Sequence, residues 1–297
     1  MENIIETRGV VKKYGEKLAV NNVSIHVRRG DIYGLIGKNG AGKTSLMKLI
    51  LGITFPSSGQ IKLFGDEPLD KARRRIGSLI EEPGLFKNCT AYENMLRYSL
   101  LIGADKNAIP GLLELVGLAD TGKKLTKAFS QGMKQRLGIA IAMLGEPEIM
   151  ILDEPINGLD PAGIKEIRDT ILRLNHEKGV TFIISSHLLD ELAKVVNNYG
   201  IINNGLLVEE ITAAALEEKC SRQIKILTND SYATLDLLRK KYPDILADVH
   251  PDGLHVYNYL EMTAEINAYL VRNDVPVYEL SRSGKDFEQF FIERLGE

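Results

Sequence analysis

The chain has 297 residues, of which 44% are hydrophobic and 26% are charged, and its formal net charge is −3 at pH 7. This composition supports a sizeable core and excludes a wholly disordered chain. The near-neutral charge lacks the basic excess of a dedicated nucleic-acid binder, and two cysteines are too few for a disulfide framework.

The N-terminus and the apolar runs bear on membrane insertion. Residues 1–6 lack a basic segment followed by an apolar stretch, so they do not form a signal peptide. No apolar run approaches the roughly 18 residues that a transmembrane helix needs. We therefore expect a cytoplasmic chain, and any action at a membrane requires another chain to cross it.

Strands are predicted for the first part of the chain. Residues 4–14 and 18–27 are β-rich, and residues 31–36 form an apolar run that ends in a glycine-rich turn. A helix is expected over residues 43–51. Helical patterning then continues from a capping box at residues 90–93 to residue 144.

Strands and helices alternate after residue 148. Residues 149–152 and 180–185 are apolar enough for buried strands. A helix to about residue 178 follows Asp160, its expected N-cap, and a shorter helix is expected over residues 188–196. Asn204 and Gly205 then predict a tight hairpin. This order favours an α/β domain with a largely parallel sheet over residues 1–212.

The pattern changes after about residue 212. The strands and helices expected there follow the order β-α-β-β-α-β, which is typical of a small split-βαβ sandwich. The strands are predicted at residues 224–227, 245–249, 254–257 and 277–280, and the helices at 232–241, 262–271 and 285–295. We expect residues 213–297 to form a separate α+β domain, whose simplest role is structural or dimer-supporting.

Residues 37–44 read GKNGAGKT and match the phosphate-loop pattern G-x-x-x-x-G-K-[ST]. They follow an apolar strand and open a helix, where backbone N–H groups converge on phosphate. A glycine-rich turn with an exposed lysine is the alternative, and this context disfavours it. We expect Lys43 to reach the β- and γ-phosphates and Thr44 to ligate Mg²⁺. The residues expected to contact nucleotide are Gly37, Lys38, Asn39, Gly40, Ala41, Gly42, Lys43, Thr44 and Ser45.

Two adjacent carboxylates, Asp153 and Glu154, end the strand over residues 149–152. One carboxylate there can hold Mg²⁺, and the other can orient or deprotonate the attacking water. A solvated Asp-Glu turn is the alternative. His187 also follows an apolar strand. It is either a structural histidine or a group that contacts the γ-phosphate.

Together these motifs resemble the nucleotide-binding subunit of an ABC transporter over roughly residues 4–212. The decisive segment is FSQGMKQR at residues 129–136, which is similar to the L-S-G-G-Q signature of that family. The order of the motifs along the chain also matches that of the family, because residues 157–160 occupy the position of the D-loop and His187 occupies that of the switch histidine. The resemblance implies a P-loop NTPase cassette with a mostly parallel sheet core, an antiparallel β subdomain and a helical subdomain at about residues 84–145.

The resemblance also implies partners and further site residues. Two subunits would sandwich two ATP molecules head to tail, so that Ser130 and Gly132 of one subunit face the phosphate loop of the other. Asp160 belongs to the D-loop, and Tyr14 lies where the family places an aromatic ring that stacks on adenine. Tyr14 can equally be a surface tyrosine of a strand. The cassette would bind the cytoplasmic face of the membrane through a permease on a separate chain.

This sequence departs from the family pattern at three positions. Gln131 and Met133 replace a glycine and the glutamine of the signature, and Glu81 stands where the family usually has glutamine. Glu81 is either a ligand near Mg²⁺ or a solvated loop carboxylate. The sequence pattern around these positions is similar to that of the family branch that includes bacitracin-export and lantibiotic-immunity ATPases.

We therefore predict an ATP-hydrolysing subunit that uses ATP and Mg²⁺, powers a multi-chain exporter and has no nucleic-acid partner. A soluble ABC ATPase acting on DNA or ribosomes is the second hypothesis, although the chain has one cassette and no room for a long coiled coil. A P-loop kinase or GTPase is the third. The basic run at residues 71–75 is either a solvated helix face or a contact with anionic lipid.

Overall fold

The computed structural model describes residues 2–220, 223–283 and 287–295. The chain divides into two compact units, Met1–Ala213 and Ala214–Glu297. Within the described ranges, every helix is too short or too polar to span a lipid bilayer.

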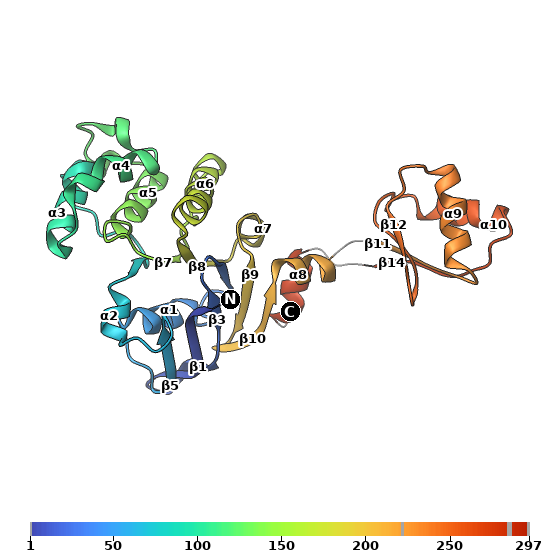
Figure 1. The fold of residues 1–297 in the computed structure, drawn as a ribbon, viewed down its shortest axis with the longest axis horizontal. Helices are drawn as coiled ribbons and strands as arrows, with labels where there is room; N and C mark the ends of the chain where they lie inside the picture. Colours follow the sequence, from blue (N-terminus) through green and yellow to red (C-terminus); the bar gives the residue numbers. More distant parts are fainter. Residues whose placement is uncertain (1, 221–222, 284–286, 296–297) are drawn as a thin grey trace. The chain divides into compact units, whose positions relative to one another are not determined.

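A six-stranded sheet forms the centre of the first unit, in the order β10-β9-β4-β8-β7-β6 (Figure 1). All neighbouring strands are parallel except β10, which joins β9 as an antiparallel edge. Strands β4, β7 and β8 are buried along their whole length, which explains their continuous apolar sequences. The strands are β4 (Ile32–Ile36), β6 (Ile76–Leu79), β7 (Ile149–Asp153), β8 (Thr181–Ser186), β9 (Asn198–Asn203) and β10 (Leu206–Thr212).

An antiparallel sheet lies on the other side of helix α1 (Lys43–Leu51). Its strands are β1 (Asn3–Tyr14), β2 (Lys17–Val23), β3 (His26–Arg28) and β5 (Ser58–Leu63), the last of which sequence patterning missed. Helix α1 buries Leu46, Met47, Leu49 and Ile50 in a core cluster that draws side chains from both sheets. The burial of α1 on several sides fixes the helix that opens with the phosphate loop.

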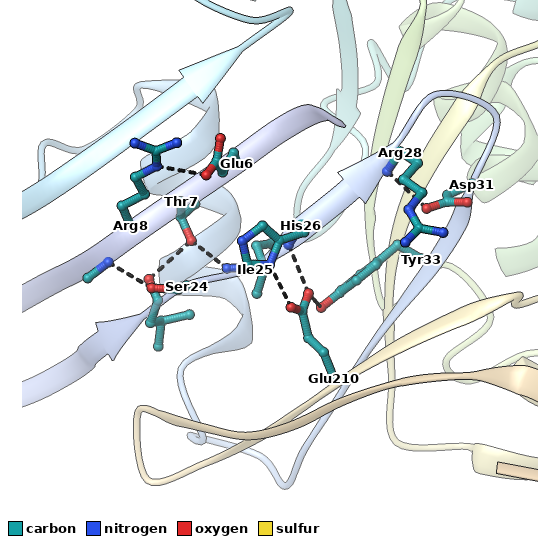
Figure 2. A network of polar contacts seen from close by, with 12 residues as sticks. Glu6, Thr7, Arg8, Ser24, Ile25, His26, Arg28, Asp31, Tyr33 and Glu210 are labelled. Atoms are coloured by element: carbon teal, nitrogen blue, oxygen red, sulfur yellow. Dashed lines mark hydrogen bonds and ion pairs between the residues drawn. The ribbon is translucent and has the colours of Figure 1, made fainter. Parts of the chain in front are cut away.

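The single strand expected over residues 18–27 is wrong, because the ladder is interrupted at Ser24 and Ile25. The Thr7 hydroxyl of β1 donates to Val23 O at 3.1 Å and accepts from Ile25 N at 2.9 Å (Figure 2). A buried side chain thus replaces a backbone partner at this point. As a result, β2 and β3 pair with different parts of β1.

Three helices pack together (Figure 1), and the last of them also packs against β6. They are α3 (Ala91–Ile102), α4 (Ile109–Leu115) and α5 (Gln131–Ala142), joined by the short 3₁₀ turns η1 (Lys106–Ala108), η2 (Ala119–Thr121) and η3 (Thr126–Ala128). The predicted capping box is present, since Glu93 N donates to Thr90 Oγ1 and Thr90 N donates to Glu93 Oε2. These contacts lower the pKa of Glu93.

Two more helices connect the strands of the central sheet. Helix α6 (Pro161–Lys178) has the predicted limits, and Asp160 caps it by accepting from Gly163 N at 3.1 Å. Helix α7 (Leu189–Ala193) is shorter than the predicted 188–196. The chain must leave this helix early, because Asn197 N already donates to Ile32 O beside the sheet.

The basic run at residues 71–75 is not a uniformly solvated helix face. Helix α2 (Leu69–Arg73) covers only part of it, and Arg73 Nε donates to Ile50 O at the end of α1. Arg75 stacks over the Phe64 ring, 3.8 Å from its centroid, and pairs with Glu148 and Glu67. Two of its arginines therefore make tertiary contacts within the first unit, which the charge pattern alone did not reveal.

The second unit contains a four-stranded antiparallel sheet in the order β12-β13-β11-β14. Its apolar cluster takes side chains from these strands and from α9 and α10. The elements are α8 (Ala213–Cys220), β11 (Gln223–Thr228), α9 (Ser231–Lys241), β12 (Ala247–His250), β13 (Gly253–Val256), α10 (Thr263–Arg272), β14 (Val277–Ser283) and α11 (Phe287–Arg294). Sequence patterning missed α8, and the predicted start of the last helix, Lys285, lies outside the described residues.

A polar network around the buried Tyr33 joins β3, β4 and β10 (Figure 2). Glu210 accepts from His26 N and from the Tyr33 hydroxyl, at 2.8 and 2.7 Å, and its other oxygen lies 2.8 Å from His26 Nδ1. Burial, and then the charge of Glu210, raise the pKa of Tyr33 well above its ordinary value. Position 200 must be glycine, because a Cβ there would lie 2.2 Å from the Tyr33 oxygen.

We expect the change Tyr33→Phe to lower the free energy of unfolding of the first unit by about 1–3 kcal/mol, because Glu210 loses a buried donor. Urea unfolding measures this change. The change Tyr232→Phe is the control, since that ring is 73% exposed on α9 and its loss should shift stability by less than about 0.5 kcal/mol. Equal stabilities for wild type and Tyr33→Phe would show that this hydroxyl contributes nothing.

Candidate active site

The candidate site lies at the carboxyl ends of three parallel strands. The phosphate loop follows β4, Asp153 and Glu154 end β7, and His187 follows β8. Because β7 and β8 both lie in the central sheet with β4, their parallel ladders bring these three chain segments to one edge. Ligands of open α/β sheets bind outside this edge.

The backbone of the phosphate loop packs against two other segments. Gly42 has φ 111° and lies so close to β2 that a Cβ would sit 2.3 Å from Ala19 O. Beside Ala19, Gly205 N of the β9–β10 hairpin donates to Ala41 O at 2.8 Å. A Cβ at position 205 would lie 3.1 Å from Ala19 O, so packing as well as positive φ favours glycine at both positions.

A cavity of about 200 Å³ opens at this loop. Its lining includes the two lysines of the loop, a lysine of β2 and one carboxylate. The lining residues are Lys17, Ala19, Lys38, Asn39, Gly40, Gly42, Lys43, Thr44, Ser45 and Glu154. Seven of the nine loop residues expected to contact nucleotide, those at 38–40 and 42–45, therefore face one space.

Lys43 is buried beside the cavity. Its Nζ donates to Gly37 O at 2.6 Å and to Lys38 O at 3.3 Å, and it forms an ion pair with Glu154 Oε1 at 3.4 Å. Because Lys43 also lines the cavity, its ammonium group can bind an anionic ligand there, such as a phosphate chain.

Asp153 joins the loop to the neighbouring strand. The Thr44 hydroxyl donates to Asp153 Oδ2 at 2.6 Å, and the Ser185 hydroxyl donates to Asp153 Oδ1 at 2.5 Å. The carboxylate is only 6% exposed. Thr44 and Asp153 were both expected at Mg²⁺, and the fold places their oxygens together.

Glu154 has a rare backbone conformation, and one oxygen of its carboxylate is buried without a hydrogen bond among the described residues. Its φ is 49°, a conformation that non-glycine residues adopt rarely, and its N–H donates to Ser185 Oγ at 2.9 Å. One oxygen, Oε2, lies 2.7 Å from His187 Nδ1, whereas Oε1 is buried and has no hydrogen-bond partner among the described residues. A carboxylate held in this way can accept a hydrogen bond from a bound water.

Glu81 follows β6, the strand beside β7, and also has a positive φ, 64°. Among the described residues, its carboxylate makes no hydrogen bond or ion pair with Thr44 or Asp153. Instead, Lys48 Nζ of α1 donates to Glu81 Oε1 at 2.6 Å. The two hypotheses for Glu81, a ligand near Mg²⁺ and a solvated loop carboxylate, did not include an ion pair with Lys48.

The other predicted site residues lie elsewhere on the first unit. Tyr14 is half exposed at the end of β1 and pairs in register with Lys17, which lines the cavity. Ser130 caps α5 by accepting from Met133 N at 3.3 Å, and Gly132 lies near the start of α6. None of these three, nor Asp160, is among the described residues that line the cavity.

Sequence reasoning missed Ser185. It is fully buried, donates to Asp153 and accepts from the N–H of Glu154, so it fixes both carboxylates. In the sequence it is the first of two serines at the end of an apolar strand. Only the pairing of β7 with β8 reveals its role, because Asp153 and Ser185 are register partners.

Comparisons with known proteins assign the family. The profile of the ABC transporter family matches residues 20–157. The bacitracin transport ATP-binding protein BcrA of Bacillus licheniformis is 42% identical over 301 residues, which cover 100% of this chain and 98% of that protein. The chain belongs to the ABC transporter ATP-binding family. The lantibiotic transport ATP-binding protein SrtF of Streptococcus pyogenes is 43% identical over 207 residues, which cover 70% of this chain and 90% of that protein.

Solved structures of the ABC family have the same fold. CbiO1 of Clostridium perfringens, part of an ABC transporter complex, superposes with a TM-score of 0.67 at 27% identity, over 74% of this chain and 92% of that one. A nucleotide-free ATP-binding cassette from an ABC transporter gives a TM-score of 0.63 at 26% identity, over 71% of this chain and 92% of the other. The predicted cassette fold is confirmed, and so is the predicted branch.

As a member of the ABC family, this protein is an ATPase subunit that hydrolyses ATP to drive transport. The hypotheses of a nucleic-acid or ribosomal ATPase and of a P-loop kinase or GTPase are not favoured. The site described above is the part of the cassette where these motifs meet.

We expect Ser185→Ala to lower ATP hydrolysis by as much as about 100-fold, because both carboxylates lose the group that positions them. Steady-state phosphate release measures the effect. The change Ser186→Ala is the matched control, since that buried hydroxyl accepts from Leu188 N instead. The same loss of hydrolysis in both variants would attribute the effect to packing of β8 and not to the carboxylates.

Proposed function

We propose that this subunit powers an exporter of a peptide antibiotic or another small amphipathic compound. The observation that carries the proposal is the full-length similarity to a bacitracin transport protein, which extends through the second unit. The similarity to the lantibiotic transport protein covers a smaller share of the chain. A bacitracin-like peptide is therefore the first substrate to test.

The residues at the site suit ATP and Mg²⁺. A hydroxyl and a carboxylate, from Thr44 and Asp153, offer the oxygen ligands that Mg²⁺ prefers. The loop at Gly40 faces open space, and the buried Oε1 of Glu154 lacks a hydrogen-bond partner among the described residues. We propose that Thr44 and Asp153 hold the ion, with Glu81 near it. When bound, Mg²⁺ would neutralise charge on the phosphate oxygens.

Hydrolysis then needs a base, a positioned water and a neutralising cation. We assign the base to Glu154, whose Oε1 would take a proton from water as the water oxygen bonds to the γ-phosphorus and the bond to the ADP oxygen breaks. The products are ADP, inorganic phosphate and a proton. His187, which shares a hydrogen bond with Glu154 Oε2, would orient the carboxylate and reach the γ-phosphate. Lys43 would balance charge on the phosphates.

A second copy, or a similar subunit, would complete the nucleotide site. Ser130 and Gly132 lie at the N-terminus of α5 and do not line the cavity of their own chain, within the part described. In a head-to-tail dimer they would offer hydrogen bonds and the positive helix end to the γ-phosphate of the partner site. Asp160 would lie at the dimer interface, and Tyr14 would stack on adenine.

We also propose where the permease binds. The last turn of α3 exposes three consecutive apolar side chains, Leu100, Leu101 and Ile102, of which Leu101 is 79% exposed. Apolar patches of this kind mark protein interaction sites. Binding there would hold the subunit on the cytoplasmic face of the membrane.

Residues 213–297 would act as an accessory domain that supports the dimer.

We expect Glu154→Gln to lower hydrolysis by about 10²- to 10⁴-fold, because glutamine cannot accept the proton. ATP affinity should persist, so the variant should accumulate as an ATP-bound dimer in size-exclusion chromatography. The change Lys43→Ala should instead weaken ATP binding, measured by equilibrium titration. Hydrolysis at the wild-type rate in Glu154→Gln would overturn the assignment and make His187 the leading candidate.

We expect a bacitracin-like peptide to stimulate ATP hydrolysis by the complex with its permease in lipid vesicles. The change Leu101→Glu should abolish both the stimulation and co-purification with the permease, because it places a charge in the apolar contact. Leu206→Glu is the control, since Leu206 is an exposed leucine of β10 on another surface. No stimulation by any peptide tested would argue against the proposed substrate, and unchanged co-purification would argue against the α3 contact.

A further inference from the structure

An ion pair joins α1 to the chain segment after β6. Lys48 Nζ lies 2.6 Å from Glu81 Oε1, and the two side chains are 30% and 67% exposed. Lys48 follows Thr44 by one helical turn, so it lies on the same side of α1 as the proposed magnesium ligand. The pair therefore stands beside the nucleotide site without lining its cavity.

The surroundings of Lys48 distinguish this pair from a random surface contact. The hydrogen bond to Glu81 raises the pKa of Lys48, and the charges of Glu81, Tyr14 and Asp153 act in the same direction. The ammonium group is thus within electrostatic range of the magnesium-binding carboxylate and of the proposed adenine contact. The positive φ of Glu81 turns its backbone where β6 ends beside β7.

The charges at this edge of the central sheet explain why Glu81 needs a cationic partner. Asp153 and Glu154 already place two carboxylates at the end of β7, and Glu81 adds a third acidic side chain from the neighbouring strand. An unbalanced third negative charge would repel the phosphates of ATP and attract divalent cations. An adjacent ammonium group removes most of that net charge without removing the carboxylate.

We propose that Lys48 is a positioning residue that neutralises and orients Glu81, and thereby sets the balance between ATP affinity and Mg²⁺ dependence at the site. This inference rests on the proposed ATP and Mg²⁺ site and adds a residue to it. It treats Lys48 and Glu81 as one functional unit, so that either substitution alone is disruptive and the two together compensate.

The test is a double-substitution cycle on the full chain, with Lys48→Met, Glu81→Gln and both together. The readouts are the Kd of a fluorescent ATP analogue in EDTA and the Mg²⁺ concentration that gives half-maximal enhancement of its binding. Lys62→Met is the matched control, because Lys62 of β5 is also 30% exposed and pairs with Asp66 at 2.6 Å.

In EDTA, we expect Lys48→Met to weaken binding of the analogue about fivefold and Glu81→Gln to tighten it by a similar factor. Lys48→Met should also lower the half-maximal Mg²⁺ concentration, and Glu81→Gln should raise it. The double variant should lie within about twofold of wild type in both readouts, as should Lys62→Met. A merely structural ion pair would change thermal stability without moving the Mg²⁺ dependence.

Two results overturn the inference. Single variants that match wild type in both readouts would reduce the pair to a surface contact, and a double variant that keeps the shift of either single variant would show that the two charges do not offset each other. If the wild-type chain binds no ATP analogue at all, the proposed nucleotide site fails, and that outcome is distinct from ATP binding that is insensitive to Lys48.

Discussion

The site depends on the contact that Asp153 makes with two hydroxyl groups. One oxygen accepts from Thr44 at the start of α1, and the other accepts from Ser185 on β8. Ser185 in turn accepts from the N–H of Glu154. A single buried carboxylate therefore fixes the phosphate loop, the acidic strand end and the strand that leads to His187. Because the residue is nearly inaccessible to solvent, its hydrogen bonds define one geometry and exclude competing water.

The remainder of the first unit holds these strand ends in place. Helix α1 is buried between the antiparallel sheet and the central sheet, and the loop before it is braced by Ala19 and Gly205. At the opposite end of β4, the Tyr33–Glu210–His26 network ties the central sheet to β3. The carboxyl ends of the strands can then carry a strained residue such as Glu154, since packing elsewhere determines the backbone.

The proposed completion of the site by another chain agrees with how its segments are used. The cavity is lined by the loop, β2 and Glu154, whereas Ser130 and Asp160 are used in their own chain as helix caps. Capping fixes the first turns of α5 and α6 and leaves their surfaces open to a partner. A dimer would therefore bind ATP through segments that are already ordered, which lowers the entropy lost on association.

The sequence by itself determined the family, the helix that carries Lys43 and Thr44, and the strand that ends at Asp153, because local periodicity and motif spacing record these directly. The order of elements in the second unit was also predictable from its alternating apolar segments. Three features were decided only by tertiary structure: the role of Ser185, the interruption at Ser24, and the partner of Glu81. Each depends on a side chain from a segment distant in sequence, namely Asp153, Thr7 and Lys48. Strand register and helix packing bring such pairs together, and no local pattern in either segment encodes the contact.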